Sequence, residues 1–191
     1  MKIARLIAPV HSLGPGDRLC LWVQGCTKQC VGCISPEMQS FIGEDIPEDM
    51  LSKILMRVAQ NGNCKALTIS GGDPLEQSSS LLFLLKNIRM YFEDILVYTG
   101  FTLEEVKNGA SGEDGKNCLK YIDVLIDGRY IDNLNEHECV LRGSSNQKIH
   151  FLNPLLKEKY NNYMKKGRML ECFTLENKTV ITGIISKEMK T

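Results

Sequence analysis

The sequence has 191 residues, 43% hydrophobic and 24% charged, which is enough apolar material for a globular core and argues against wholesale disorder. Lys plus Arg and Asp plus Glu number 23 each, so the formal net charge is zero, which argues against a main role in binding nucleic acid or acidic membranes. No apolar stretch is long enough to span a bilayer and no signal-peptide pattern is present, so we expect a cytoplasmic protein.

The N-terminal part predicts two strands, a cysteine-rich loop and a helix. Residues 2–10 and 19–24 have the apolar composition of strands, and a turn-rich stretch joins them. Residues 25–39 show no clear period and read as a loop. A helix begins after Asp45 and ends at residues 61–63. Its apolar face consists of Leu51, Ile54, Leu55 and Val58.

The middle of the chain alternates strands and helices. The short strand 66–70 is followed by Gly-Gly-Asp-Pro and by an amphipathic helix. After a strand at 95–98, Thr102 and Glu105 form a capping box that starts a short helix. The apolar face of the amphipathic helix consists of Leu81, Leu84, Leu85, Ile88 and Phe92.

The last third predicts a polar loop at 109–117 and strands at 122–126 and 148–152. Residues 154–166 predict a charged helix, and the β-rich runs 169–174 and 179–185, on either side of a turn at 175–178, predict a hairpin. We therefore expect a core domain of residues 1–152 and a C-terminal extension of residues 153–191 packed on it.

Alternating strands and helices are typical of parallel β/α units, and active sites in such barrels gather at the carboxyl ends of the strands. A polar or glycine-rich cluster follows four of the predicted strands. These clusters begin after Gln24, after Ser70, at Thr99 and at Asp127. We expect them to meet on one rim.

Eight cysteines in a reducing compartment indicate metal binding or buried thiols more than disulfides. Cys26, Cys30 and Cys33 form a C-x3-C-x2-C motif whose three thiolates suit a 4Fe–4S cluster with one iron left open. A zinc site and a ferredoxin-like site remain alternatives, with His11 as the nearest histidine. The scattered cysteines, expected to be buried and apolar, are Cys20, Cys64, Cys118, Cys139 and Cys172.

Two further clusters have both a functional and an ordinary interpretation. In Ser70-Gly71-Gly72-Asp73-Pro74 the glycines let the backbone approach a ligand and Asp73 can accept from an amine, although the motif alone is an ordinary turn. Arg129 can clamp a carboxylate, or simply carry charge in a turn. The polar residues 142–147 alone read as a solvated loop.

Together these motifs resemble the radical-SAM superfamily (SAM is S-adenosylmethionine). Within it they are most similar to the small glycyl-radical activating members, in particular the activating proteins of anaerobic (class III) ribonucleoside-triphosphate reductases. The resemblance covers residues 14 to 152. The matching segments are GPGDRLCLWVQGC, CTKQCVGC, SGGDPL, VYTGFTLEEV, DVLIDGRYIDNL and LRGSSNQKIHFL.

The resemblance implies an α/β fold, a partial (β/α) barrel with the C-terminal helix and β-hairpin as an extension. It implies one 4Fe–4S cluster on the three motif cysteines, with the amine and carboxylate of SAM on the fourth iron. The residues that it places around SAM are Gly71, Gly72 and Asp73 at the amine, Thr99, Asp127 and Arg129 near the ribose or carboxylate, Gly32 and Ile34 at the adenine, and Asn146 closing the pocket.

The implied reaction is reductive cleavage of SAM to methionine and a 5′-deoxyadenosyl radical, which takes a glycine α-hydrogen from the partner reductase. No side chain acts as a general acid or base. The electron comes from a one-electron donor such as flavodoxin. Neither nucleic acid nor membrane is an expected partner.

Two departures from the family pattern bear on the target. Ile34 stands where activating proteins usually have an aromatic residue after the third cysteine, and no tryptophan follows within a few residues. The tail beyond residue 153 is also long. A related radical-SAM enzyme acting on another protein, peptide or small molecule therefore remains an alternative, as does a non-catalytic iron–sulfur or zinc module.

Overall fold

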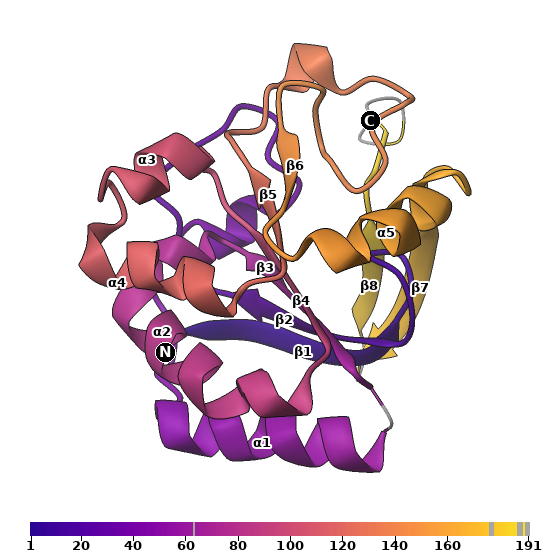
Figure 1. Ribbon diagram of the computed structural model, residues 1–191. Helices are drawn as coiled ribbons and strands as arrows, with labels where there is room; N and C mark the ends of the chain where they lie inside the picture. Colours follow the sequence, from indigo (N-terminus) through magenta and orange to yellow (C-terminus); the bar gives the residue numbers. More distant parts are fainter. Residues whose placement is uncertain (63, 176–177, 187–188, 190–191) are drawn as a thin grey trace.

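The computed structural model describes residues 1–191 except 63, 176–177, 187–188 and 190–191. Six strands form one sheet whose order follows the chain, β1 to β6 (Figure 1). The four central strands are parallel, while β1 and β6 run antiparallel to their neighbours. The strands are β1 (Ile3–Val10), β2 (Arg18–Val23), β3 (Ala66–Gly71), β4 (Asp94–Tyr98), β5 (Val124–Asp127) and β6 (Lys148–Phe151).

The helices between the parallel strands cover one face of the sheet (Figure 1). The main core lies there, because alternate residues of β2, such as Leu19 and Leu21, pack with Leu55 and Leu85 of the first two helices. The four helices are α1 (Glu48–Asn61), α2 (Ser78–Ile88), α3 (Leu103–Lys107) and α4 (Gly112–Cys118). The predicted capping box of α3 is confirmed, with Thr102 and Glu105 bonded reciprocally.

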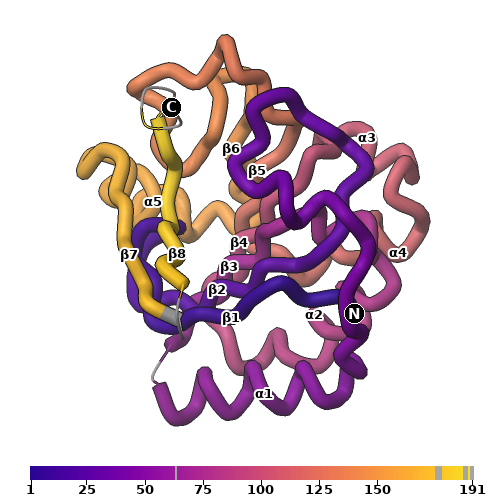
Figure 2. Tube along the Cα trace, turned by 180° about the vertical axis from the view of Figure 1, so that it is seen from behind, coloured from indigo at the N-terminus to yellow at the C-terminus, as the bar shows by residue number. Residues whose placement is uncertain are grey.

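The C-terminal segment covers part of the opposite face. It consists of α5 (Lys157–Met164) and a hairpin of β7 (Leu170–Leu175) and β8 (Lys178–Gly183). Phe173 and Val180 of the hairpin pack against a cluster that includes Trp22. Figures 1 and 2 both place the hairpin beside the connection between β1 and β2, with β8 nearer to the sheet than β7.

A buried polar network ties this segment to the sheet. Arg18 at the start of β2 is fully buried and donates to Asp94 Oδ2 at 2.9 Å. Tyr160 of α5 donates to Asp94 Oδ1 at 2.7 Å. Arg18 also donates to Thr68 Oγ1 at 2.6 Å, so each buried polar group in the network has a partner.

Two expectations are wrong: residues 109–117 are not a loop throughout, and Cys172, expected to be buried, is exposed on β7. Residues 109–117, predicted as a loop, contain α4, because Cys118 and Gly115 pack against α2 and offset the weak helix propensity of this polar stretch. The expected α/β fold with a mainly parallel sheet is confirmed; within the described residues the sheet is open, with β1 and β6 as its two edges. Asn63 at the predicted helix end and residues 176–177 of the predicted hairpin turn lie outside the described residues.

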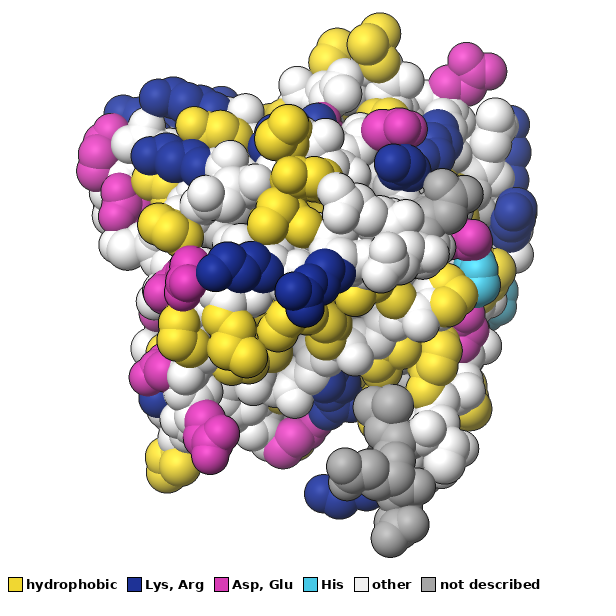
Figure 3. Space-filling model, turned by 90° about the horizontal axis from the view of Figure 1, so that it is seen from below, with side chains coloured by type: hydrophobic (Ala, Val, Ile, Leu, Met, Phe, Trp, Pro, Cys, Tyr) yellow, Lys and Arg dark blue, Asp and Glu magenta, His cyan; other side chains and the backbone are white. Residues whose placement is uncertain are grey.

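The surface carries both signs of charge. Figure 3 shows Lys and Arg side chains among Asp and Glu on the lower face of the molecule, and neither sign forms a continuous field there. This mixture agrees with the zero formal net charge. No helix in the described part of the chain is long and apolar enough to cross a bilayer.

Candidate functional site

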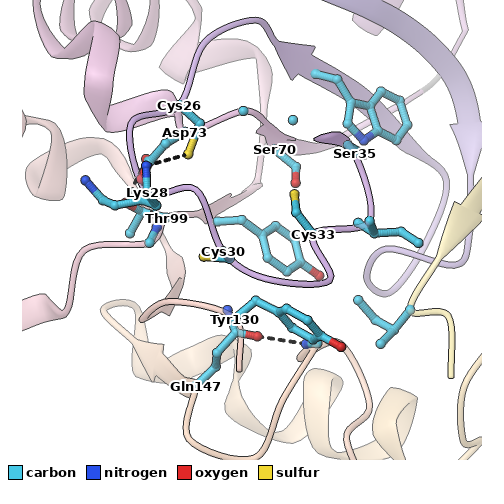
Figure 4. A pocket seen from close by; sticks show the side chains of 18 of the residues that line it. Cys26, Lys28, Cys30, Cys33, Ser35, Ser70, Asp73, Thr99, Tyr130 and Gln147 are labelled. Atoms are coloured by element: carbon cyan, nitrogen blue, oxygen red, sulfur yellow. Dashed lines mark hydrogen bonds between the residues drawn. The ribbon is translucent and has the colours of Figure 1, made fainter. Parts of the chain in front are cut away.

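One cavity lies at the carboxyl ends of the central strands, on the face opposite the helices. All three motif cysteines line it, together with the turn that follows β3 and the end of β4 (Figure 4). The predicted site residues on its wall are Cys26, Cys30, Cys33, Ile34, Gly71, Gly72, Asp73 and Thr99. Parallel strands therefore bring distant motifs onto one rim, as their positions at strand ends predict.

The cysteine loop is held from both sides. At its base, the amide of Gly25 donates to the Met38 carbonyl at 2.7 Å, and the amide of Cys26 donates to the Gln39 carbonyl at 2.9 Å. On the other side, Lys28 Nζ lies 2.8 Å from Glu76 Oε1 and 3.3 Å from the centroid of the Phe101 ring. The Lys28 side chain is only 7% exposed, so this ion pair is shielded from solvent and fixes the loop against the turn that follows β3.

The three motif cysteines line one cavity without forming a site for a single ion. Among the described residues, no three His, Cys, Asp or Glu side chains converge on one metal position. A cuboidal cluster needs no such convergence, because each thiolate binds a different iron. His11 is not available to complete a zinc site, since its ring nitrogens bond to Glu171 at 2.8 Å and Asp17 at 3.0 Å.

Gly71 and Gly72 are required by packing as well as by the cavity. Gly71 has a φ of +107°, and a Cβ there would lie 2.4 Å from the Val23 carbonyl oxygen. A Cβ on Gly72 would lie 2.2 Å from the Gly25 carbonyl oxygen. The turn after β3 thus lies directly against β2 and the cysteine loop, and this close approach lets the motifs share one cavity.

Asp73 joins the ends of β3 and β4. Its carboxylate accepts from Thr99 Oγ1 at 2.8 Å, from the Gly100 amide at 2.9 Å and from the Leu75 amide at 3.1 Å. Burial raises the pKa of Asp73 to about 6, although these hydrogen bonds and nearby Lys28 oppose the shift. The carboxylate is therefore occupied by backbone and hydroxyl donors at the cavity wall.

Four predicted site residues lie off the wall of the cavity. The Asp127 carboxylate accepts from the Leu103 and Lys148 amides and pairs with His150 Nε2 at 2.7 Å, so it joins β5 to α3 and β6. Arg129 is exposed, and its carbonyl accepts from Asn146 Nδ2 at 2.9 Å.

Gly32 is the fourth of these residues, and it contacts the segment that follows β5. Its Cβ position is filled by Asp132 Oδ1, which lies 2.5 Å away. The cysteine loop therefore meets this segment closely, and the φ of +70° at this position favours glycine.

The cavity also includes residues that the sequence interpretation did not select. Gln147, next to Asn146, lines it and accepts from the Gly143 amide at 2.8 Å; Figure 4 shows Gln147 beside Tyr130. Tyr98 lines it from β4, and its hydroxyl is buried without a partner. The strand register aligns Trp22, Ser70 and Tyr98 across the sheet, and this inward row could have been derived from the alternation of the strands.

Residues 12–150 match a family described as a 4Fe-4S single cluster domain. The chain is 35% identical over 143 residues to the anaerobic ribonucleoside-triphosphate reductase-activating protein of Haemophilus influenzae, covering 72% of this chain and 89% of that protein. The protein of the same name from Escherichia coli is 33% identical over 149 residues, covering 73% of this chain and 91% of that one. That of Enterobacteria phage T4 is 33% identical, with 71% and 85% covered.

The chain belongs to this family of activating proteins. The relationship confirms the resemblance drawn from the motifs, and the matched domain confirms the prediction of an iron–sulfur protein. Helix α5 and the β7–β8 hairpin lie beyond the residues that the domain covers.

Proposed function

We propose that this chain is a radical-SAM enzyme that installs a glycyl radical on an anaerobic ribonucleoside-triphosphate reductase. The observation that carries the proposal is the common cavity of Cys26, Cys30 and Cys33 with the turn after β3, in a chain of this family. The buried, unpartnered hydroxyl of Tyr98 in the same cavity supports a polar ligand there, since such groups cost free energy unless a partner satisfies them.

The three cysteines would hold three irons of a 4Fe–4S cluster, and SAM would bind the fourth through its amine and carboxylate. When bound, the cluster and SAM supply one-electron cleavage of the sulfonium, which yields methionine and a 5′-deoxyadenosyl radical. Gly71, Gly72 and Asp73 would form the wall at the amine, with Asp73 setting the turn through its three bonds.

Other residues act on the same pocket directly or through a neighbour. Thr99 lines the wall and holds Asp73, and Ile34 offers an apolar surface for the adenine, next to Gly32. Arg129, proposed to lie near the ribose or carboxylate, is positioned by its neighbours. Asp127 accepts from the Lys148 amide, and Asn146 donates to the Arg129 carbonyl.

The chain's own residues position and shield the reactants. The ion pair of Lys28 with Glu76 fixes the cysteine loop, and the C-terminal hairpin closes one side of the cavity. Excluding water protects a radical from side reactions. No proton transfer by a side chain is required.

The proposal also covers the fold type, the domain bounds, the partners and the compartment. The sheet corresponds to a partial radical-SAM barrel, with residues 1–152 as the catalytic core and 153–191 as an extension packed on it. The partner is the reductase, and the electron donor is a one-electron carrier such as flavodoxin. The expected compartment is the cytoplasm.

Anaerobic reconstitution tests the proposal. The protein should take up about four irons per chain, release 5′-deoxyadenosine with SAM and dithionite, and give a glycyl-radical EPR doublet on the reductase. Cys30→Ala should lose iron and all release, while Cys172→Ala, at an exposed cysteine outside the loop, should keep both. A protein that binds only zinc would refute the enzymatic function.

A second candidate is a related radical-SAM enzyme with a different target. The long C-terminal segment beyond the matched domain favours it, because this segment lines the cavity that a target must reach. Release of 5′-deoxyadenosine without any radical on the reductase would support this second candidate.

A further inference from the structure

One wall of the cavity is a continuous stretch of backbone. Residues 181–185, at the end of β8 and just beyond it, all line the cavity that contains the motif cysteines. A strand that turned one face to the cavity would contribute only alternate residues. Three consecutive strand residues, 181–183, therefore indicate that the edge of β8 runs along the cavity, and Figure 4 shows this segment beside the site.

The register of the hairpin shows which backbone groups this edge presents. The ladder closes at Leu175 and Lys178, with two residues between them, and such a closing pair exchanges both ladder hydrogen bonds. Bonded and non-bonded pairs alternate, so Ile181, opposite Cys172, is a non-bonded position. Gly183, with a φ of +117°, leaves the regular strand geometry. The amide and carbonyl of Ile181 therefore point away from β7.

These outward groups have no other partner in the described structure. Among the described residues, no backbone group of residues 181–184 makes a hydrogen bond outside the β7–β8 ladder. The Ile181 side chain is half exposed. An open strand edge with an apolar side chain is a template for pairing with another extended chain.

The hairpin is fixed at both ends of this edge. Glu171 Oε2 accepts from the amides of His11 at 2.8 Å and Ser12 at 2.7 Å, and Thr182 Oγ1 lies 2.9 Å from Ser12 Oγ. Beyond the strand, Asn135 donates to the Ile185 carbonyl at 3.1 Å. The edge is thus held rigidly at the cavity, which lowers the entropy cost of binding to it.

We infer that an extended peptide segment of the radical-accepting protein pairs with residues 181–184 as an added strand. This inference rests on the proposed function and names how that function's partner is recognised. Backbone pairing suits a target whose reacting atom is a glycine α-hydrogen, because a glycine offers no side chain to grip. Ile181 contributes the side-chain contact, and the added strand runs along the wall of the reaction cavity.

Hydrogen–deuterium exchange tests the pairing. We expect the amides of residues 181–184 in the reconstituted, SAM-bound protein to exchange at least about tenfold more slowly when the purified reductase is bound, with β7 unchanged. Unchanged exchange at 181–184 in a complex whose formation is verified by sedimentation would overturn the inference. If the unsubstituted protein makes the glycyl radical although exchange at residues 181–184 is not slowed, the proposed function stands and the pairing alone is wrong.

A pair of proline variants separates the two edges. Ile181→Pro removes a donor from the cavity edge, and Cys172→Pro removes the matching donor from the outer edge of β7, at the same level of the ladder. The ratio of glycyl radical to 5′-deoxyadenosine should fall at least about tenfold in Ile181→Pro and stay unchanged in Cys172→Pro. Equal ratios would contradict the pairing, and if either variant fails to fold, the exchange experiment decides.

Discussion

Tyr98 illustrates how a single side chain can favour a bound state. Its hydroxyl is buried in the cavity wall without a partner, and burial raises its pKa well above the ordinary value, so it remains a donor. Tyr98→Phe removes this unsatisfied group. We expect a higher melting temperature for the ligand-free protein and an affinity for SAM lower by about tenfold, or about 1.4 kcal/mol.

Differential scanning fluorimetry and calorimetric titration measure the two effects of Tyr98→Phe. Tyr163→Phe is the matched control, because the Tyr163 hydroxyl donates to the His11 carbonyl at 2.7 Å and its loss should lower the melting temperature. Unchanged SAM affinity in Tyr98→Phe would show that this hydroxyl does not meet the ligand.

Asp73 gives a pH-dependent prediction. Its pKa is raised from 3.8 to about 6 by burial, so between these values the folded protein binds more protons than the unfolded chain. Stability from this group therefore falls as pH rises from about 4 to about 6, then stays level. In Asp73→Asn this pH dependence disappears. The free energy of unfolding falls by about 1–3 kcal/mol, because the side-chain NH2 of Asn would face the Gly100 amide, which is also a donor.

Urea unfolding of the metal-free protein at several pH values measures the Asp73 effect. The difference in the free energy of unfolding between the unsubstituted protein and Asp73→Asn should shrink from pH 4 to pH 6 and stay constant above pH 6. A difference that grows over this range would mean that the carboxylate is ionised throughout, with its pKa set by hydrogen bonding rather than by burial.

At the scale of elements, the attachment of β7 to the β1–β2 connection depends on pH. The hydrogen bond to Glu171 raises the pKa of His11, and Asp17 adds to the shift. Although burial raises the pKa of Glu171, its bonds to His11 and Ser12 keep it below the ordinary value. Protonated His11 therefore stabilises the hairpin, fully below about pH 6.5, and this stabilisation is lost as pH rises through the raised pKa.

We expect the melting temperature of the unsubstituted protein to exceed that of His11→Gln at pH 6 and to approach it at pH 9. His137→Gln, at an exposed histidine, should show no such trend. If the melting temperatures of the unsubstituted protein and His11→Gln differ by a constant amount from pH 6 to pH 9, the stabilisation comes from a hydrogen bond of neutral His11 and not from an ion pair.

Element by element, the sequence predicts strands better than their directions. Buried strands such as β3 and β4 are short, mostly apolar runs that the sequence pattern detects, and Thr102 with Glu105 marks the start of α3. Helix α4 is missed, because its residues are polar and contain two glycines, and packing against α2 stabilises it. The antiparallel direction of β6 depends on the connection across the sheet, which no local pattern records.

At the scale of the whole molecule, the motifs predict eight residues of the cavity wall but misplace Gly32, Asp127, Arg129 and Asn146, and they do not predict how the cavity is closed. Cys26, Asp73 and Thr99 meet as expected, because strand ends of parallel units share one edge. The sequence interpretation does not select Tyr98 and Gln147, because it selects their neighbours Thr99 and Asn146 instead. The wall formed by β8 depends on contacts between residues more than 150 positions apart, such as His11 with Glu171, and sequence periodicity contains no information about these.

The C-terminal extension should unfold together with the sheet. The extension shares both a core and a buried network with the sheet, since Tyr160 is fully buried and bonds to Asp94, which also pairs with Arg18. We therefore expect one unfolding transition, with calorimetric and van't Hoff enthalpies that agree. Tyr160→Phe should lower stability by about 1–3 kcal/mol within that single transition, because it leaves the buried carboxylate short of a donor.

A lower, separate transition in the Tyr160→Phe protein would mean that residues 153–191 unfold on their own. The hairpin would then be a detachable cover of the cavity. A single transition instead means that the wall along β8 is as stable as the sheet itself. A partner strand added at residues 181–184 would then bind to a preformed edge, and its affinity would carry no cost for ordering the hairpin.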